Sequence, residues 1–125
     1  MSWKLLVVED SEPIRFGLTE YFTIRGFLVD SARGLDEALA LLRVHQYDLV
    51  ITDLRLSEAR QVEGLDIIAE ALARCPTTRV VLLTAYGSPP VEAAATHLGV
   101  SLFLQKPIRL GDLERAAMNL LEPAA

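Results

Sequence analysis

The chain has 125 residues, of which 51% are hydrophobic and 23% are charged, and its formal net charge is -5. This length and apolar content suit one compact domain, and the lack of a Lys- or Arg-rich run argues against direct nucleic-acid binding. No long apolar segment suggests a signal peptide or a membrane span, and the single cysteine, Cys75, cannot form an internal disulfide. We therefore expect a cytoplasmic domain over residues 1–121, followed by a tail, 122–125, that frays or begins a linker.

Five short segments rich in apolar and β-branched residues alternate with helical patterns along the chain. After the first segment, Ser11 can cap a helix with Pro13 in its first turn, and Gly26 ends that helix. Its apolar stripe contains Ile14, Leu18, Tyr21 and Phe22. The predicted strands are Leu5–Val8, Phe27–Ser31, Leu49–Thr52, Val80–Thr84 and Leu102–Leu104.

Apolar periodicity predicts three further amphipathic helices, and the fourth helix in chain order is shorter and rich in alanine. This fourth helix runs from about Pro90 to Leu98 and stops at Gly99. The other helices are marked by Leu35, Leu39 and Leu42, by Leu65, Ile68 and Leu72, and by Leu110, Leu113, Ala117 and Leu120. A strand followed by a helix, five times over, predicts an α/β fold with a doubly wound, five-stranded parallel sheet.

Acidic residues follow directly after two of the predicted strands. Glu9 and Asp10 follow Val8, and Asp53 follows Thr52. In a flavodoxin-like sheet with strand order 2-1-3-4-5, the first and third strands are neighbours at the point where strand order reverses, and ligands bind there. We therefore expect the three carboxylates to share one pocket.

Three carboxylates in one pocket repel one another unless protons or a cation intervene. Mg²⁺ is the simplest such cation, because it prefers one or two carboxylates, several waters and a phosphate oxygen. On the same rim, Thr84 ends the fourth strand, and Lys106 and Pro107 follow the fifth. A hydroxyl and an ammonium beside a metal site are what a transferred phosphoryl group requires. The simpler alternative is that Asp10 and Asp53 only cap the loops and the helix that follow them.

With these residues in place, the sequence resembles the receiver domain of two-component response regulators, from Lys4 to about Leu121. The resemblance implies that Asp53 accepts a phosphoryl group from a phosphohistidine on a sensor histidine kinase or a phosphotransfer protein. Such a domain acts on no separate substrate. The matching residues are Glu9, Asp10, Asp53, Thr84, Ala85, Phe103, Lys106 and Pro107.

The resemblance also implies a role for each of the other matching side chains. Mg²⁺ would be held by Asp10, by Asp53, by Glu9 through water and by the backbone carbonyl of Arg55. Lys106 would contact the phosphoryl group. Thr84 and Phe103 would form a coupled switch pair, with output through the face formed by the fourth helix, the fifth strand and the fifth helix. That face would bind a downstream protein or a second copy of the chain.

The segment after Asp53 departs from the family pattern. The family usually has a proline four residues after the phosphoacceptor, where this chain has Ser57, and a glycine soon after that. Here Gly64 comes 11 residues after Asp53, which predicts a longer and more polar loop. Insertions in surface loops are thermodynamically mild, so we expect the core chemistry to survive. Arg55 in this loop is either a solvated arginine or a residue that tunes the site.

Three other interpretations compete with a free-standing receiver. A Mg²⁺-dependent phosphatase resembling the haloacid dehalogenases needs a second aspartate two residues after the nucleophile, where this chain has Arg55. A flavodoxin-type binding module needs a Gly-, Ser- or Thr-rich phosphate loop after the first strand, where this chain has "EDSEP". The third alternative is a receiver that forms part of a longer regulator or a hybrid kinase.

Overall fold

The computed structural model describes residues 2–54, 63–85 and 88–122. Five strands and five helices alternate along these ranges. The helices are α1 (Glu12–Ile24), α2 (Leu35–Val44), α3 (Glu63–Arg74), α4 (Pro89–Leu98) and α5 (Leu110–Leu121). The strands are β1 (Lys4–Val8), β2 (Leu28–Ala32), β3 (Leu49–Thr52), β4 (Arg79–Thr84) and β5 (Leu102–Gln105).

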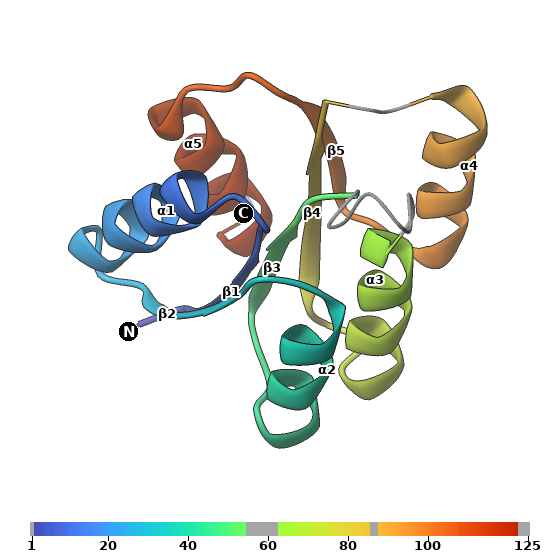
Figure 1. Ribbon diagram of the computed structural model, residues 1–125, viewed down its shortest axis with the longest axis horizontal. Coiled ribbons are helices and arrows are strands. Elements are labelled where there is room, and N and C mark those ends of the chain that lie inside the picture. Colours follow the sequence, from blue (N-terminus) through green and yellow to red (C-terminus); the bar gives the residue numbers. More distant parts are fainter. Residues whose placement is uncertain (1, 55–62, 86–87, 123–125) are drawn as a thin grey trace.

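The strands form one sheet in the order β2-β1-β3-β4-β5, and every neighbouring pair is parallel. Helices α1 and α5 cover one face of this sheet, while α2, α3 and α4 cover the other (Figure 1). The predicted α/β fold, with its doubly wound sheet and strand order 2-1-3-4-5, is therefore confirmed. Among the described helices, none combines the length and the apolar character needed to cross a bilayer.

The boundaries of five elements differ by one residue from those predicted. β1 and β4 begin one residue earlier, at Lys4 and Arg79, β2 ends one residue later, at Ala32, and β5 ends one residue later, at Gln105. β2 begins at Leu28 because the amide of Phe27 donates to the carbonyl of Phe22, 3.0 Å away, and so belongs to the turn that follows α1. α4 begins at Pro89 rather than Pro90, since proline is well suited to the first turn of a helix. All these shifts arise at element ends, where hydrogen bonds of turns and caps decide the assignment.

Alternate residues of the strands supply two separate hydrophobic cores, one on each face of the sheet. This alternation follows from the pleat, which points successive side chains to opposite faces. The core under α2, α3 and α4 takes Leu6, Val8, Val50, Val80 and Leu82 from the strands. The core under α1 and α5 takes Leu5, Val7, Leu49, Ile51, Val81 and Leu83.

Helix α1 has the predicted signals at both of its ends. The Ser11 hydroxyl accepts a hydrogen bond from the amide of Ile14 at 3.5 Å, and Gly26 adopts a left-handed φ of 98° after the helix. Leu18 and Phe22 are buried against the sheet, but Ile14 is 45% exposed. The first turn of the apolar stripe therefore lies at the surface, next to the carboxyl ends of the strands.

Helices α1 and α5 are joined by polar contacts to Glu114. The Tyr21 hydroxyl donates to Glu114 Oε1 at 2.7 Å, and Arg25 Nε donates to Glu114 Oε2 at 2.9 Å. These contacts hold the pKa of the Glu114 carboxyl below its usual value, with the Tyr21 hydrogen bond as the largest cause. One carboxylate thus links the two helices on this face.

The position of Trp3 gives a negative prediction about metal binding. Trp3 precedes β1, and its carbonyl accepts a hydrogen bond from the amide of Leu28 at 2.9 Å, at the edge where the strands begin. Asp10 follows the other end of β1, about 20 Å away at ~3.3 Å per strand residue. Addition of Mg²⁺ should therefore scarcely change tryptophan fluorescence. Strong quenching in a MgCl₂ titration would contradict this separation of Trp3 from the site.

Candidate phosphoryl-acceptor site

The three predicted carboxylates lie together at the carboxyl ends of β1 and β3. The sheet register pairs Val8 with Thr52, and the amide of Asp53 donates to the carbonyl of Val8 at 3.1 Å. Glu9, Asp10 and Asp53 each offer one carboxylate oxygen within 4.8 Å of the others. Glu9 and Asp53 are buried and Asp10 is exposed, so the cluster opens to solvent on one side.

Lys106 links the two buried carboxylates. Its ammonium donates to Glu9 Oε1 at 2.6 Å and to Asp53 Oδ2 at 2.7 Å. The Lys106 amide also donates to the carbonyl of Thr84 at 3.0 Å, which fixes the chain just after β5 beside the end of β4. The lysine therefore reaches the carboxylates from the far side of β4.

Burial and ion pairing act in opposite directions on the ionisation of these groups. Burial raises the pKa of Glu9, although the hydrogen bond from Lys106 opposes this effect. Burial by itself would lower the pKa of Lys106, but hydrogen bonds to Asp53 and Glu9 outweigh it and raise that pKa. The lysine consequently stays charged and neutralises part of the acidic cluster.

The backbone around the acidic pair is held by several hydrogen bonds. The Glu9 amide donates to the carbonyl of Ala32 at 3.0 Å, and the Ser11 amide donates to Glu9 Oε2 at 3.0 Å. Arg15 Nη1 lies 3.0 Å from the Glu9 carbonyl oxygen and 3.5 Å from that of Asp10. Because Ser11 is the N-cap of α1, the alternative in which Asp10 caps this helix is wrong.

The arginine contact was not anticipated from the sequence. Arg15 lies between apolar positions of α1 and looks like an ordinary solvated helix residue. The available signal was its position four residues after the cap at Ser11, whose carbonyl accepts from the Arg15 amide at 2.8 Å. That spacing places a long cationic side chain one turn above the acidic loop.

Thr84 and Phe103 lie on the same face of the sheet, under α3 and α4. Thr84 follows Leu82 by two residues and so points to the same face, and Phe103 pairs with Leu82 in the parallel register. Thr84 is fully buried, whereas Phe103 is half-buried and packs against the core of that face. The hydroxyl and the ring are thus neighbours on adjacent strands, next to Lys106.

Gly64, in the first turn of α3, approaches the backbone just after β3 very closely. A Cβ atom at this position would lie 2.3 Å from the Asp53 carbonyl oxygen and 2.7 Å from the Leu54 Cα. The Gly64 amide donates to the carbonyl of Leu54 at 2.9 Å. Only a residue without a side chain permits this approach. The spacing of Gly64 from Asp53 stands out in the sequence, but it does not predict this contact.

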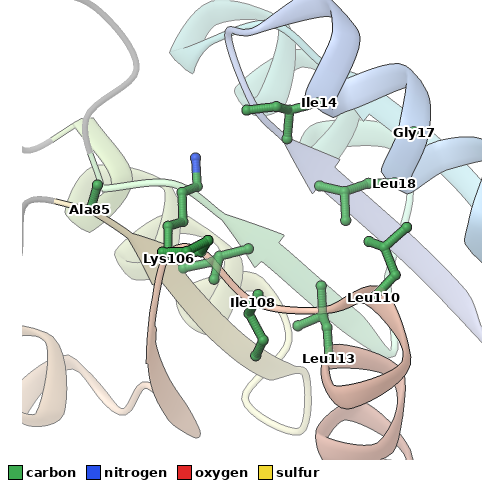
Figure 2. Close-up of a pocket in the computed structure, with 10 residues that line it drawn as sticks. Ile14, Gly17, Leu18, Ala85, Lys106, Ile108, Leu110 and Leu113 are labelled. Carbon is green, nitrogen blue, oxygen red and sulfur yellow. The ribbon is translucent and has the colours of Figure 1, made fainter.

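An apolar cavity of about 500 Å³ lies beside the carboxylates, between α1 and α5. Ile14 and Leu18 line it from α1, Leu113 from α5, and Ala85 and Pro107 from the loops that follow β4 and β5. Figure 2 shows the Lys106 stem among these residues, with its nitrogen directed away from the apolar lining. Lys106 therefore belongs to both the cavity and the carboxylate cluster.

Three predicted features lie wholly or mostly outside the described residues. The backbone carbonyl of Arg55, expected as a metal ligand, and Ser57, expected in the place of a proline, both lie in residues 55–62. The predicted tail, 122–125, is described only at Glu122. All three therefore remain predictions.

The donor set fits a hard divalent cation. Carboxylate oxygens suit Mg²⁺, and a cluster with one exposed side leaves room for the waters and the phosphate oxygen that this ion retains. Lys106 neutralises only part of the charge of three carboxylates, which leaves an excess of negative charge for a cation to balance.

A family model for the response regulator receiver domain matches residues 5–118. The chain belongs to this family. The transcriptional regulatory protein GlrR of Escherichia coli is 37% identical over 97% of this receiver, and the response regulator protein PilR of Pseudomonas aeruginosa is 37% identical over 98%. The receiver spans only 27% of the length of each of these relatives. It spans 60% of RegA, the photosynthetic apparatus regulatory protein of Cereibacter sphaeroides, at 31% identity.

Solved structures share the receiver fold over almost the whole chain. A CheY-like receiver from Methanospirillum hungatei superposes with a TM-score of 0.87 at 22% identity, covering 96% of this chain and 94% of that one. A response regulator from Burkholderia pseudomallei, crystallised with a phosphorylated aspartic acid, a calcium ion and citrate, gives a TM-score of 0.82 at 27% identity. That match covers 99% of this chain and 76% of the other.

The Gly64 contact predicts that a glycine-to-alanine change in this helix lowers the stability of the domain, whereas the same change in a helix usually raises it. Gly64→Ala should lower the free energy of unfolding by about 1–3 kcal/mol, because the added methyl overpacks the Asp53 backbone. Gly111→Ala in α5 is the matched control. Its Cβ would meet open space, so it should stabilise the domain by about 0.5–1 kcal/mol. Urea denaturation compares the two variants, and equal stabilisation of both would contradict the close approach.

Proposed function

We propose that this receiver accepts a phosphoryl group on Asp53 from a phosphohistidine of a sensor histidine kinase or a phosphotransfer protein. A carboxylate oxygen of Asp53 forms a bond to phosphorus while the bond between phosphorus and the donor imidazole nitrogen breaks. The electron pair of that bond leaves with the imidazole. Hydrolysis of the resulting acyl phosphate returns Asp53 to its starting state, so the domain acts on no separate substrate.

The observation that carries this proposal is the pairing of Lys106 with Asp53 inside an acidic cluster. The ammonium lies 2.7 Å from Asp53 Oδ2 and is placed to neutralise oxygens of a phosphoryl group on that residue. The phosphorylated aspartic acid and the calcium ion of the Burkholderia pseudomallei regulator support the same chemistry in a relative.

Mg²⁺ is the proposed cofactor. Asp10 and Asp53 would hold it directly, Glu9 would act through water, and the backbone carbonyl of Arg55 would complete the protein ligands. The ion supplies positive charge to the phosphoryl oxygens. The chain itself would contribute the Lys106 ammonium and the Thr84 hydroxyl as donors to the phosphoryl oxygens.

The apolar cavity beside Lys106 offers a docking surface for the phosphodonor protein. A donor must bring its phosphohistidine to Asp53, and so it must cover the surface next to Lys106. Ile14, 45% exposed, extends the apolar surface of α1 there. Burial of this side chain on docking contributes about 25 cal/mol for each Å² removed from water.

The output surface is proposed at the β5 edge of the sheet, where α4, β5 and α5 meet. Thr84 and Phe103 connect the phosphoryl site to this face, since both point toward α3 and α4. A half-buried ring that takes two positions supplies the two-state element that coupling requires. The partner is a downstream protein or a second copy of this chain. Because the relatives GlrR and PilR are about four times longer, the partner could equally be another domain of a longer regulator.

Replacement of the phosphoacceptor tests the central proposal. Asp53→Asn should abolish labelling by acetyl phosphate or by a phosphorylated kinase, because an amide is a far poorer nucleophile. Asp112→Asn is a matched control, since Asp112 is an exposed residue of α5 that pairs with Arg115. Persistent labelling of the Asp53→Asn protein, measured by radiolabel transfer, would overturn the assignment.

Replacement of Thr84 tests the switch. Coupling of about 1–3 kcal/mol predicts that phosphorylation changes partner affinity or self-association by roughly 5–150-fold. Thr84→Ala should leave Asp53 phosphorylatable but shrink this change, because the hydroxyl that recognises the phosphoryl group is lost. Thr84→Ser keeps a hydroxyl and should restore most of the response. Sedimentation with and without beryllofluoride and Mg²⁺ measures self-association, and equal responses of wild type and Thr84→Ala would count against a switch role.

A further inference from the structure

Arg15 makes an unusual contact with the backbone of both acidic residues that follow β1. The residue belongs to α1, but its side chain turns back over the start of the helix. There Nη1 lies 3.0 Å from the Glu9 carbonyl oxygen and 3.5 Å from the Asp10 carbonyl oxygen. Arg15 is half-buried, so its guanidinium is not simply a solvated surface charge.

The other contacts of this segment hold Glu9 more firmly than Asp10. The Glu9 amide continues the sheet pairing to Ala32, and both Glu9 carboxylate oxygens accept hydrogen bonds, from Lys106 and from the Ser11 amide. Asp10 lies beyond the last sheet hydrogen bond and is exposed. The Arg15 contact with its carbonyl therefore restrains the backbone of the one residue of the cluster whose carboxylate faces solvent.

We propose that Arg15 is a positioning residue, which fixes the peptide groups of Glu9 and Asp10 so that their carboxylates are held ready for a divalent cation. This inference rests on the proposed function of the site. Residues that hold metal ligands in place without touching the metal commonly change affinity by 10–100-fold when they are replaced. A charged donor to a carbonyl is also stronger than a neutral one.

The positive charge of Arg15 and its positioning role have opposite effects on Mg²⁺ affinity. A guanidinium near the cluster repels Mg²⁺, so its removal would tighten binding if charge were all that mattered. Loss of positioning would instead weaken binding. The direction of the change in Mg²⁺ affinity therefore separates the two effects.

The experiment is calorimetric titration of MgCl₂ into the unphosphorylated protein and its variants. Arg15→Met should raise the Kd for Mg²⁺ about tenfold. Arg15→Lys keeps the charge on a chain one bond shorter, and it should give a Kd between those of wild type and Arg15→Met. Arg33→Met is the matched control, because it removes an equal charge from an exposed residue that pairs with Glu37, and it should bind Mg²⁺ like wild type.

A second measurement, on the metal-free protein, reports positioning directly. Hydrogen exchange of the Ser11 amide, which donates to the Glu9 carboxylate, should be faster in Arg15→Met and Arg15→Lys, while exchange of the Ile51 amide in β3 should be unchanged. If Arg15→Met proves too unstable to titrate, Arg15→Lys decides by the same two measurements.

Two results would overturn the inference: an Arg15→Met Kd equal to or below that of wild type, or unchanged Ser11 exchange in both variants. Failure of the proposed function is a different outcome. In that case wild type itself would bind no Mg²⁺, or Asp53→Asn would bind the ion as tightly as wild type does.

Discussion

The ion pairs of Lys106 with Asp53 and Glu9 hold together the carboxyl ends of β5, β3 and β1. Two buried carboxylates this close would be very costly without a cation between them, because neither repulsion nor lost hydration would be offset. One ammonium offsets much of this cost but not the charge of the whole cluster. The carboxylates can therefore be buried in the folded domain while the site keeps a net negative charge. This net charge suits the binding of a divalent cation, which in turn can offset the negative charge that a phosphoryl group would add.

Much of the fold and of the site's location could be predicted from the sequence, since both follow from periodicity and topology. The parallel order 2-1-3-4-5 makes β1 and β3 neighbours, so residues after Val8 and after Thr52 must lie at the same edge. No side-chain detail was needed for that step. The alternation of two strand faces likewise fixed which residues enter each core.

The contacts that could not be predicted depend on the exact position of helix ends relative to the sheet. The approach of Gly64 to Asp53 requires the position of α3, which begins at Glu63, after a segment that is longer than the family pattern predicts. The contact of Arg15 requires its side chain to turn back toward the helix start, a choice of rotamer rather than of sequence pattern. The first residue of β2 depended on whether the Phe27 amide joined the sheet or the preceding turn. Each case was decided by a single hydrogen bond or close contact.

The hydrogen bond from the Gly64 amide to the Leu54 carbonyl brings together the two ends of the segment between them. A segment whose ends already meet can gain residues at little entropic cost, because each doubling of loop length costs only about 0.6 kcal/mol. Evolution or protein engineering can therefore vary the length and chemistry of this segment without displacing Asp53. A peptide tag or a ligand-binding insert placed in this segment would lie close to Asp53 along the chain, and so it could sense a change at the site.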